Sequence, residues 1–261
     1  MSIVEHLRPV ACRASFLWSF NNAAAAAGLA AGVLFLVFPE LDLQFTRLFY
    51  RPGAGFAGHA APHLAILRWL FVLFYYTCIA VAVVGVIRTR LGRGTWLALA
   101  PRQWLFLAVC LGAGPGLVAN VLLKEQLGRA RPKHVVAFGG DKAFSPPLVP
   151  GRECVHACSF VSGEAASVFT PFYAAALLLP RCSLLLAAVG TVAGLAAGLV
   201  RISQGAHFLS DVIFAGVFMA LTVLIVYRLM FGPRWVWASA ARPPGANPAA
   251  ADGRDPSLQL V

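Results

Sequence analysis

The chain consists of long apolar runs separated by short polar segments. Six runs contain no charged residue and approach the length of a membrane-crossing helix: residues 23–38, 69–87, 104–123, 165–180, 183–200 and 212–227. A helix needs about 20 apolar residues to cross the hydrocarbon core of a bilayer, so we expect flanking residues to complete the short first and fourth crossings. The pattern predicts an all-α fold, a polytopic membrane bundle of about six transmembrane helices.

The composition supports this interpretation. Hydrophobic residues make up 59% of the 261 positions and charged residues only 12%, more apolar material than a soluble core needs. The formal net charge of +11 is spread over the polar segments. No basic patch interleaved with aromatic residues is present, which argues against nucleic acid as a partner. We expect one membrane domain over residues 1–232, followed by a disordered tail over residues 233–261 that is rich in Ala, Pro and Gly.

The basic residues indicate an orientation, but only weakly. Arginines precede the first run, separate the second from the third and the fourth from the fifth, and follow the sixth. By the positive-inside rule these segments, and with them the tail, are cytoplasmic. The opposite segments are also basic. The orientation therefore becomes convincing only if the basic residues after Leu123 serve to bind an anion.

A polar segment over residues 133–160 lies on the outer side and is punctuated by Gly and Pro. Loops of this length are commonly functional lids or disordered, and the polar motifs on either side favour a lid. Cys154 and Cys158 lie close together here, in what we take to be an oxidising compartment. They can form a disulfide, an outcome that the spacing favours no more than two free thiols. The spacing offers too few ligands for zinc, so we expect no metal site.

Three polar clusters stand at the ends of apolar runs, and counting the crossings places all three on one side of the membrane. Residues 124–132 follow an outgoing run, residues 162–164 precede the next returning run, and residues 201–211 follow the outgoing run after that. Ionisable groups at the edge of a bilayer are expensive to keep there, so they indicate a functional site.

The first two clusters suit an anion. Lys124 and Arg131 are seven residues apart, two helical turns, and can converge from one helical stripe, whereas Glu125 and Arg129 read as a surface pair. Arginine grips phosphate oxygens in a bidentate manner, and lysine adds a point charge. Backbone amides at Gly163 can approach the same anion at a helix N-terminus. The predicted ligand is a phosphate group.

The third cluster places an imidazole near a carboxylate. If a helix begins near His207, then His207 and Asp211 lie on one face, and the carboxylate can hold one ring nitrogen while the other stays free. The pair is a candidate nucleophile with its orienting group. Taken singly, His207 would more often be a packing residue and Arg201 an interfacial anchor. The joint pattern is what favours catalysis.

In order, these residues resemble the tripartite signature of the type-2 phosphatidic acid phosphatase family, whose superfamily includes vanadium haloperoxidases. The first motif is K-x6-RP, the second PSGH and the third SR-x5-H-x3-D. The matching residues are Lys124, Arg131 and Pro132, then Ser162 and Gly163, then Arg201, His207 and Asp211, with Val200 in place of the usual serine. Three motifs in this order on one face are far more specific than any one of them alone.

The resemblance implies hydrolysis of a phosphate monoester without a metal or other cofactor. His207 would attack phosphorus to give a phosphohistidine, and Asp211 would fix the tautomer of the ring. The charge on the equatorial oxygens would be stabilised by Lys124, Arg131, Arg201, Ser162 and the Gly163 amide.

Glu164 departs from the family pattern, which has a histidine at this position to protonate the leaving oxygen. Glu164 is our first candidate for the general acid, although nearby cations favour its ionised form. His156 or His134 from the loop could supply the proton instead. The leaving group could also be good enough to need little protonation, as with a diphosphate, or hydrolysis could have been lost.

The resemblance thus predicts a multi-pass enzyme of a bacterial inner membrane that hydrolyses a phosphate ester of a membrane lipid. Its site would face the periplasm beneath the loop. Candidate substrates are lipid A, phosphatidylglycerophosphate, phosphatidic acid and a polyprenyl diphosphate, and Glu164 with the basic loop favours lipid A by analogy. Two alternatives stay open: a phosphotransferase with the same intermediate, and a lipid-phosphate binding or transport protein without turnover.

Overall fold

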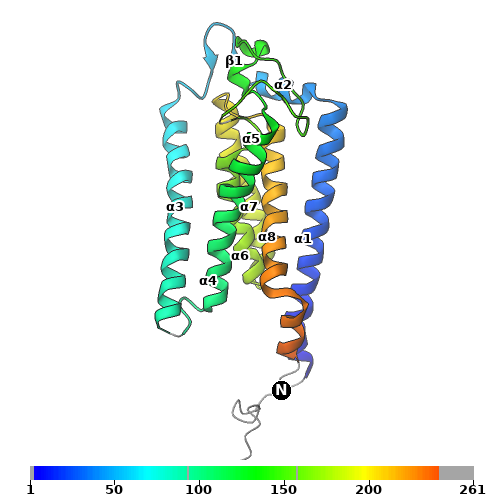
Figure 1. The fold of residues 1–261 in the computed structure, drawn as a ribbon, viewed down its shortest axis with the longest axis vertical. Coiled ribbons are helices and arrows are strands. Elements are labelled where there is room, and N and C mark those ends of the chain that lie inside the picture. Colours follow the sequence, from blue (N-terminus) through cyan, green and yellow to red (C-terminus); the bar gives the residue numbers. More distant parts are fainter. Residues whose placement is uncertain (1–2, 93, 157, 241–261) are drawn as a thin grey trace, which may run out of the picture.

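The computed structural model of the protein describes residues 3–92, 94–156 and 158–240, except for the side chains of residues 3–14, 125 and 233–240. Residues 241–261, most of the predicted disordered tail, lie outside the described residues. The main helices form one bundle (Figure 1). They are α1 (Ile3–Val37), α3 (Pro62–Leu91), α4 (Pro101–Leu111) with its π-helical continuation η1 (Gly112–Leu123), α6 (Gly163–Leu178), α7 (Ser183–Ser203) and α8 (Leu209–Ala240). The predicted all-α membrane bundle is confirmed.

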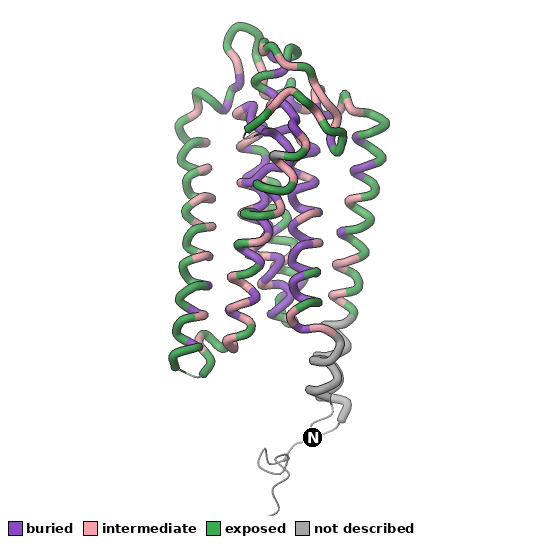
Figure 2. Tube along the Cα trace, in the orientation of Figure 1, coloured by how far each residue is buried: buried purple, intermediate pink, exposed green. Residues whose placement is uncertain are grey.

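Five helices of the described chain are long and apolar enough to cross a membrane: Ser15–Val37, Pro62–Leu91, Pro101–Leu123, Ser183–Ser203 and Leu209–Gly232. The remaining predicted crossing is α6, which has 16 residues and is short for a span. It contacts α3, α4, η1, α7 and α8, and most of its residues are buried (Figure 2). Helix α6 is therefore surrounded mainly by other helices, whereas the outer helices have faces that we expect to contact lipid.

Pro115 interrupts the third crossing. Proline lacks a backbone N–H and its ring clashes with the preceding turn, and here the chain widens into the 12-residue π-helical segment η1. The Nδ2 amide of Asn120 donates a hydrogen bond to the Pro115 carbonyl at 2.8 Å. This contact fixes the Asn120 amide, whose oxygen accepts from Lys124. The irregular segment thereby helps to place the first residue of the first motif.

The polar connections gather at one end of the bundle, which we call the outer end (Figure 1). They include α2 (Glu40–Arg47), the antiparallel strands β1 (Tyr50–Arg51) and β2 (Gly55–Phe56), helix α5 (Lys124–Leu127), and the 3-10 turns η2 (Pro132–His134) and η3 (Val136–Phe138). A small apolar cluster packs them together and consists of Phe56, Ala130, Val135, Phe138 and Phe208. The start of α6, the end of α7 and the start of α8 lie at the same end, so the three polar clusters meet there.

Candidate active site

A cavity of about 530 Å³ lies at the outer end, between α3, η1, α6 and α7. Its polar wall is formed by Arg68, Asn120, Lys124, Arg131, Gly163, Glu164, Arg201 and His207. Further along α3 the wall becomes apolar and aromatic, with Phe71, Tyr75 and Ile79 on successive turns. Such a cavity suits an amphipathic ligand with an anionic head and an apolar body.

Lys124 and Gly163 meet at the polar wall. Lys124 Nζ donates to Asn120 Oδ1 at 2.9 Å, and a Cβ on Gly163 would stand only 3.2 Å from Nζ and 2.9 Å from Oδ1. Glycine at the start of α6 therefore leaves room for the ammonium group beside a helix N-terminus. Burial, with the charge of Arg131 nearby, lowers the pKa of Lys124 to about 8.

Arg131 reaches the cavity from a different element than Lys124. Helix α5 ends at Leu127, and Gly128 turns the chain with a left-handed backbone, φ 53°. The prediction that Lys124 and Arg131 share one helical stripe is therefore wrong, because glycine adopts this conformation readily and ends the helix. Both side chains nevertheless line the cavity.

His207 lies between α7 and α8, buried at 2% exposure. Helix α8 begins only at Leu209, so the predicted helical face shared with Asp211 does not form. The Nδ1 atom of His207 lies 2.7 Å from the Ser159 carbonyl oxygen and 3.7 Å from Asp211 Oδ2. A proton on Nδ1 can be donated to the Ser159 oxygen, which leaves Nε2 as the nitrogen with a free electron pair. Burial lowers the pKa of His207 to about 4, against the opposing effect of Asp211.

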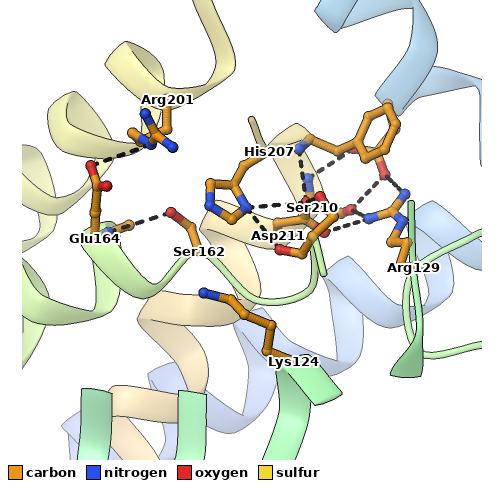
Figure 3. A network of polar contacts seen from close by, with 12 residues as sticks. Lys124, Arg129, Ser162, Glu164, Arg201, His207, Ser210 and Asp211 are labelled. Atoms are coloured by element: carbon orange, nitrogen blue, oxygen red, sulfur yellow. Dashed lines mark hydrogen bonds and ion pairs between the residues drawn. The ribbon is translucent and has the colours of Figure 1, made fainter. Parts of the chain in front are cut away.

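Asp211 is held by three donors. Its carboxylate accepts from Ser159 Oγ at 2.5 Å and from the Phe208 amide at 2.8 Å, and Arg129 Nη1 lies 2.5 Å from Oδ1 (Figure 3). The sequence predicts a direct hydrogen bond from His207 to Asp211. In the structure the Ser159 carbonyl makes the closer contact with the ring, and Asp211 fixes Ser159 through its hydroxyl.

Arg129 is the centre of a buried ion network behind His207. It is 1% exposed, so the predicted surface pair with Glu125 is wrong, because α5 ends before Arg129 and the chain turns inward. Arg129 Nη2 lies 2.8 Å from Asp42 Oδ2 on α2, and Nε donates to the Ser145 carbonyl at 2.8 Å. Asp42 also accepts from the Ser210 amide at 2.8 Å. The network therefore joins α2, the long loop and the start of α8.

Two guanidinium groups contact Glu164. Arg68 Nε donates to its two carboxylate oxygens at 3.0 and 3.1 Å, and Arg68 Nη2 lies 2.9 Å from Oε1. Arg201 Nε lies 3.3 Å from Oε2, and Arg201 Nη1 donates to Gln204 at 2.5 Å. The carboxylate of Glu164 is therefore shared between two guanidinium groups.

Ser162 is buried beneath this wall. As the N-cap of α6, its hydroxyl accepts from the Ala165 amide at 3.4 Å, and its own amide donates to the Asp211 carbonyl oxygen at 3.1 Å. The second motif is thereby tied directly to the third. Contact between the Ser162 hydroxyl and phosphate stays a prediction.

The loop over residues 133–160 packs on the ion network and not into the cavity. None of its described residues lines the cavity, and His134 and His156 are exposed. The loop instead supplies Ser159. Cys154 and Cys158 are joined by a disulfide with Cα atoms 5.6 Å apart. In the parts of the chain that the structure describes, no three His, Cys, Asp or Glu side chains gather as a metal site requires.

Sequence reasoning missed three contributors to this site. Arg68 is the only charged residue in the apolar stretch over residues 64–87, and a charge in such a stretch is a usable signal for function. Asn120 is a polar residue near the end of an apolar run. Ser159 carries no local signal, because its role depends on a backbone carbonyl.

The family resemblance is supported by comparison with known proteins. The PAP2 superfamily model matches residues 103–235. A lipid A 4'-phosphatase from Francisella tularensis subsp. novicida is 40% identical over 77% of this chain and 91% of the relative. One from Rhizobium etli is 36% identical over 69% of this chain and 75% of the relative. A lipid A 1-phosphatase from Rhizobium etli is 38% identical over 43% of this chain and 46% of the relative.

No solved structure matches the chain. The family model covers all the motif residues from Lys124 to Asp211, and the relatives extend the similarity over most of the membrane bundle. The resemblance drawn from the motifs is confirmed, and the chain belongs to the PAP2 superfamily.

Proposed function

We propose that this membrane-bound lipid phosphatase removes a phosphate group from lipid A, and that His207 carries the phosphoryl group between the lipid and water. The observation that supports this most directly is the position of His207 in the cavity. It lies in the same wall as Lys124, Arg131 and Arg201, with Nδ1 against the Ser159 carbonyl. The named relatives, two lipid A 4'-phosphatases and a lipid A 1-phosphatase, support the choice of lipid.

The reaction runs in two displacements. The electron pair on His207 Nε2 attacks phosphorus, and the bond from phosphorus to the lipid oxygen breaks, giving a phosphohistidine and a lipid oxygen that takes up a proton. Water then attacks the phosphohistidine, releasing inorganic phosphate and restoring His207. In both steps Lys124, Arg131 and Arg201 stabilise the charge on the three other oxygens of the phosphoryl group.

The first displacement also needs a donor that protonates the leaving oxygen of the lipid. Glu164 lines the cavity, and both Arg68 and Arg201 contact its carboxylate. His134 and His156 are exposed and do not line the cavity. The acid role of Glu164 stays a prediction, and the variants described below test it.

The cavity faces the periplasm of a bacterial inner membrane. Part of the positive charge of the outer end, which weakens the positive-inside signal, is accounted for by the site: Arg68, Lys124, Arg131 and Arg201 line the cavity and Arg129 is buried in ion pairs. The opposite end keeps Arg88, Arg90, Arg102, Arg181 and Arg228. The disulfide in the outer loop also suits an oxidising compartment.

A substrate panel tests this function. Detergent-purified protein in EDTA should release free phosphate from lipid A faster than from phosphatidic acid, phosphatidylglycerophosphate or undecaprenyl diphosphate. Label that appears on an acceptor lipid would show a phosphotransferase, and binding without release would show a lipid-phosphate binding protein. The same assay on intact spheroplasts should work with substrate added outside, and activity only after the membrane is opened would contradict the periplasmic placement.

The two shifted pKa values predict a bell-shaped pH profile. Below about pH 4 His207 is protonated and cannot attack, whereas above about pH 8 Lys124 is neutral and holds phosphate less well, so kcat/KM should fall on both sides. In Lys124→Arg the guanidinium stays charged, so the alkaline fall should move to higher pH. Lys142→Arg, a control outside the cavity whose side chain is 44% exposed, should keep the wild-type profile. An alkaline fall that stays near pH 8 in Lys124→Arg would count against Lys124.

A further inference from the structure

Arg68 enters the site from a part of the chain outside the matched family region. It lies on the second turn of α3, whereas the family model begins at residue 103. Its guanidinium holds Glu164 through Nε, at 3.0 and 3.1 Å from the two oxygens, and through Nη2, at 2.9 Å. The ion pair therefore joins α3 to the first turn of α6.

The Arg68–Glu164 pair has no net charge. Glu164 places a negative charge in the wall of the cavity where we propose that phosphate binds. Two negative charges close together repel each other. Arg68 adds one positive charge beside it. Together they leave the cavity with the net charge that the three motif cations Lys124, Arg131 and Arg201 provide by themselves.

Arg68 is also accessible to a ligand. Its side chain is 36% exposed, against 12% for Arg201, and it lines both the main cavity and an adjoining cavity of about 230 Å³. Within the described chain, all the polar contacts of Arg68 with Glu164 use Nε and Nη2. The third nitrogen, Nη1, can therefore donate to a phosphate oxygen while the pair stays intact.

We propose that Arg68 is a fourth phosphate-binding cation of this enzyme, and that Glu164 is the positioning residue that holds its guanidinium at the mouth of the cavity. The proposal rests on the function proposed above, because the anion it places at Arg68 is the phosphoryl group that is removed. Glu164 then acts on the substrate through Arg68 and donates no proton. The alternative is a purely structural ion pair that fastens α3 to α6.

A double-mutant cycle on lipid A separates these roles. Arg68→Gln should raise KM and the inhibition constant of orthovanadate, a phosphate-like anion, by about tenfold each with little change in kcat, as expected for one lost hydrogen bond to a charged group. Glu164→Gln should lower kcat/KM in the wild-type background. In the Arg68→Gln background the same substitution should have no effect or raise kcat/KM, because the carboxylate that repels phosphate is then removed.

A general acid gives a different pattern. Glu164→Gln would then lower kcat by the same factor in both backgrounds, and that result would overturn the proposal. Unchanged KM and unchanged vanadate inhibition in Arg68→Gln would overturn it as well and leave the structural ion pair. Arg51→Gln, an exposed arginine at the same end, is the matched control and should match the wild type.

Two further measurements keep the test decisive. If Arg68→Gln does not fold, Arg68→Lys keeps the charge without the two-pronged contact, and its KM should lie above that of the wild type. If the wild type releases no phosphate from any lipid, the proposed function fails. Binding of inorganic phosphate to the wild type and to Arg68→Gln still tests Arg68, and equal affinities would refute its role.

Discussion

Replacing His207 with glutamine is expected to stop phosphate release, with kcat lowered by roughly 10⁴-fold or more, as for the loss of other catalytic nucleophiles. Glutamine is close to histidine in size and can keep a donor towards the Ser159 carbonyl, so the buried position stays filled. It offers no basic nitrogen at the place of Nε2. Binding of phosphate should survive, because Lys124, Arg131 and Arg201 are unchanged.

The phosphohistidine itself can be trapped. With lipid carrying a radioactive phosphate, the wild-type protein quenched in alkali should retain label that acid removes, and His207→Gln should retain none. His63→Gln, an exposed histidine at the start of α3, is the control and should behave as the wild type. Normal turnover by His207→Gln, or label that survives acid, would contradict attack by His207.

Most of the residues that line the site could be predicted from the sequence, because a membrane restricts where polar residues can lie. Each apolar run has to cross the bilayer, so counting runs assigns every polar cluster to a side. This count assigns Lys124, Gly163 and His207 to one side, and the structure brings them to one cavity. The irregular backbone at Pro115 follows from the residue type, since proline disturbs any helix.

The contacts between distant segments could not be predicted. Arg68 meets Glu164 across 96 positions and Arg129 meets Asp42 across 87, and no periodicity encodes which helices are neighbours. Asp42 stands in a polar connection where a solvated carboxylate is the usual expectation. Its burial follows from the packing of α2 against α8, which is a property of the whole fold.

Arg129 shows how a single glycine changes the interpretation of a pattern. At a spacing of four from Glu125 it suits a surface ion pair on a continuous helix. That prediction requires helical backbone through position 128, and Gly128 instead takes φ 53° with the Gly151 carbonyl packed where a side chain would stand. The chain turns inward there, and Arg129 becomes the most deeply buried cation among the residues that the structure describes.

Replacing Arg129 with methionine should both destabilise the protein and disable the site. The substitution leaves the carboxylates of Asp42 and Asp211 buried without their shared partner, which typically costs about 3–5 kcal/mol. For a chain of this size such a loss lowers Tm by roughly 10 °C. Activity should fall as well, because Asp211 fixes Ser159, whose carbonyl orients His207. Thermal unfolding in detergent and kcat/KM on lipid A measure the two effects.

A second substitution separates stability from orientation. Adding Asp42→Asn to Arg129→Met removes one of the two stranded charges, so part of the lost Tm should return. Asp211 still lacks its guanidinium partner in this double variant, and kcat/KM should stay low. Arg47→Met, an exposed arginine on α2, is the control and should shift stability by no more than about 0.5 kcal/mol. If activity recovered in step with Tm, Arg129 would serve the fold alone. If Tm recovered without activity, the buried network would be what holds the nucleophile in line with its substrate.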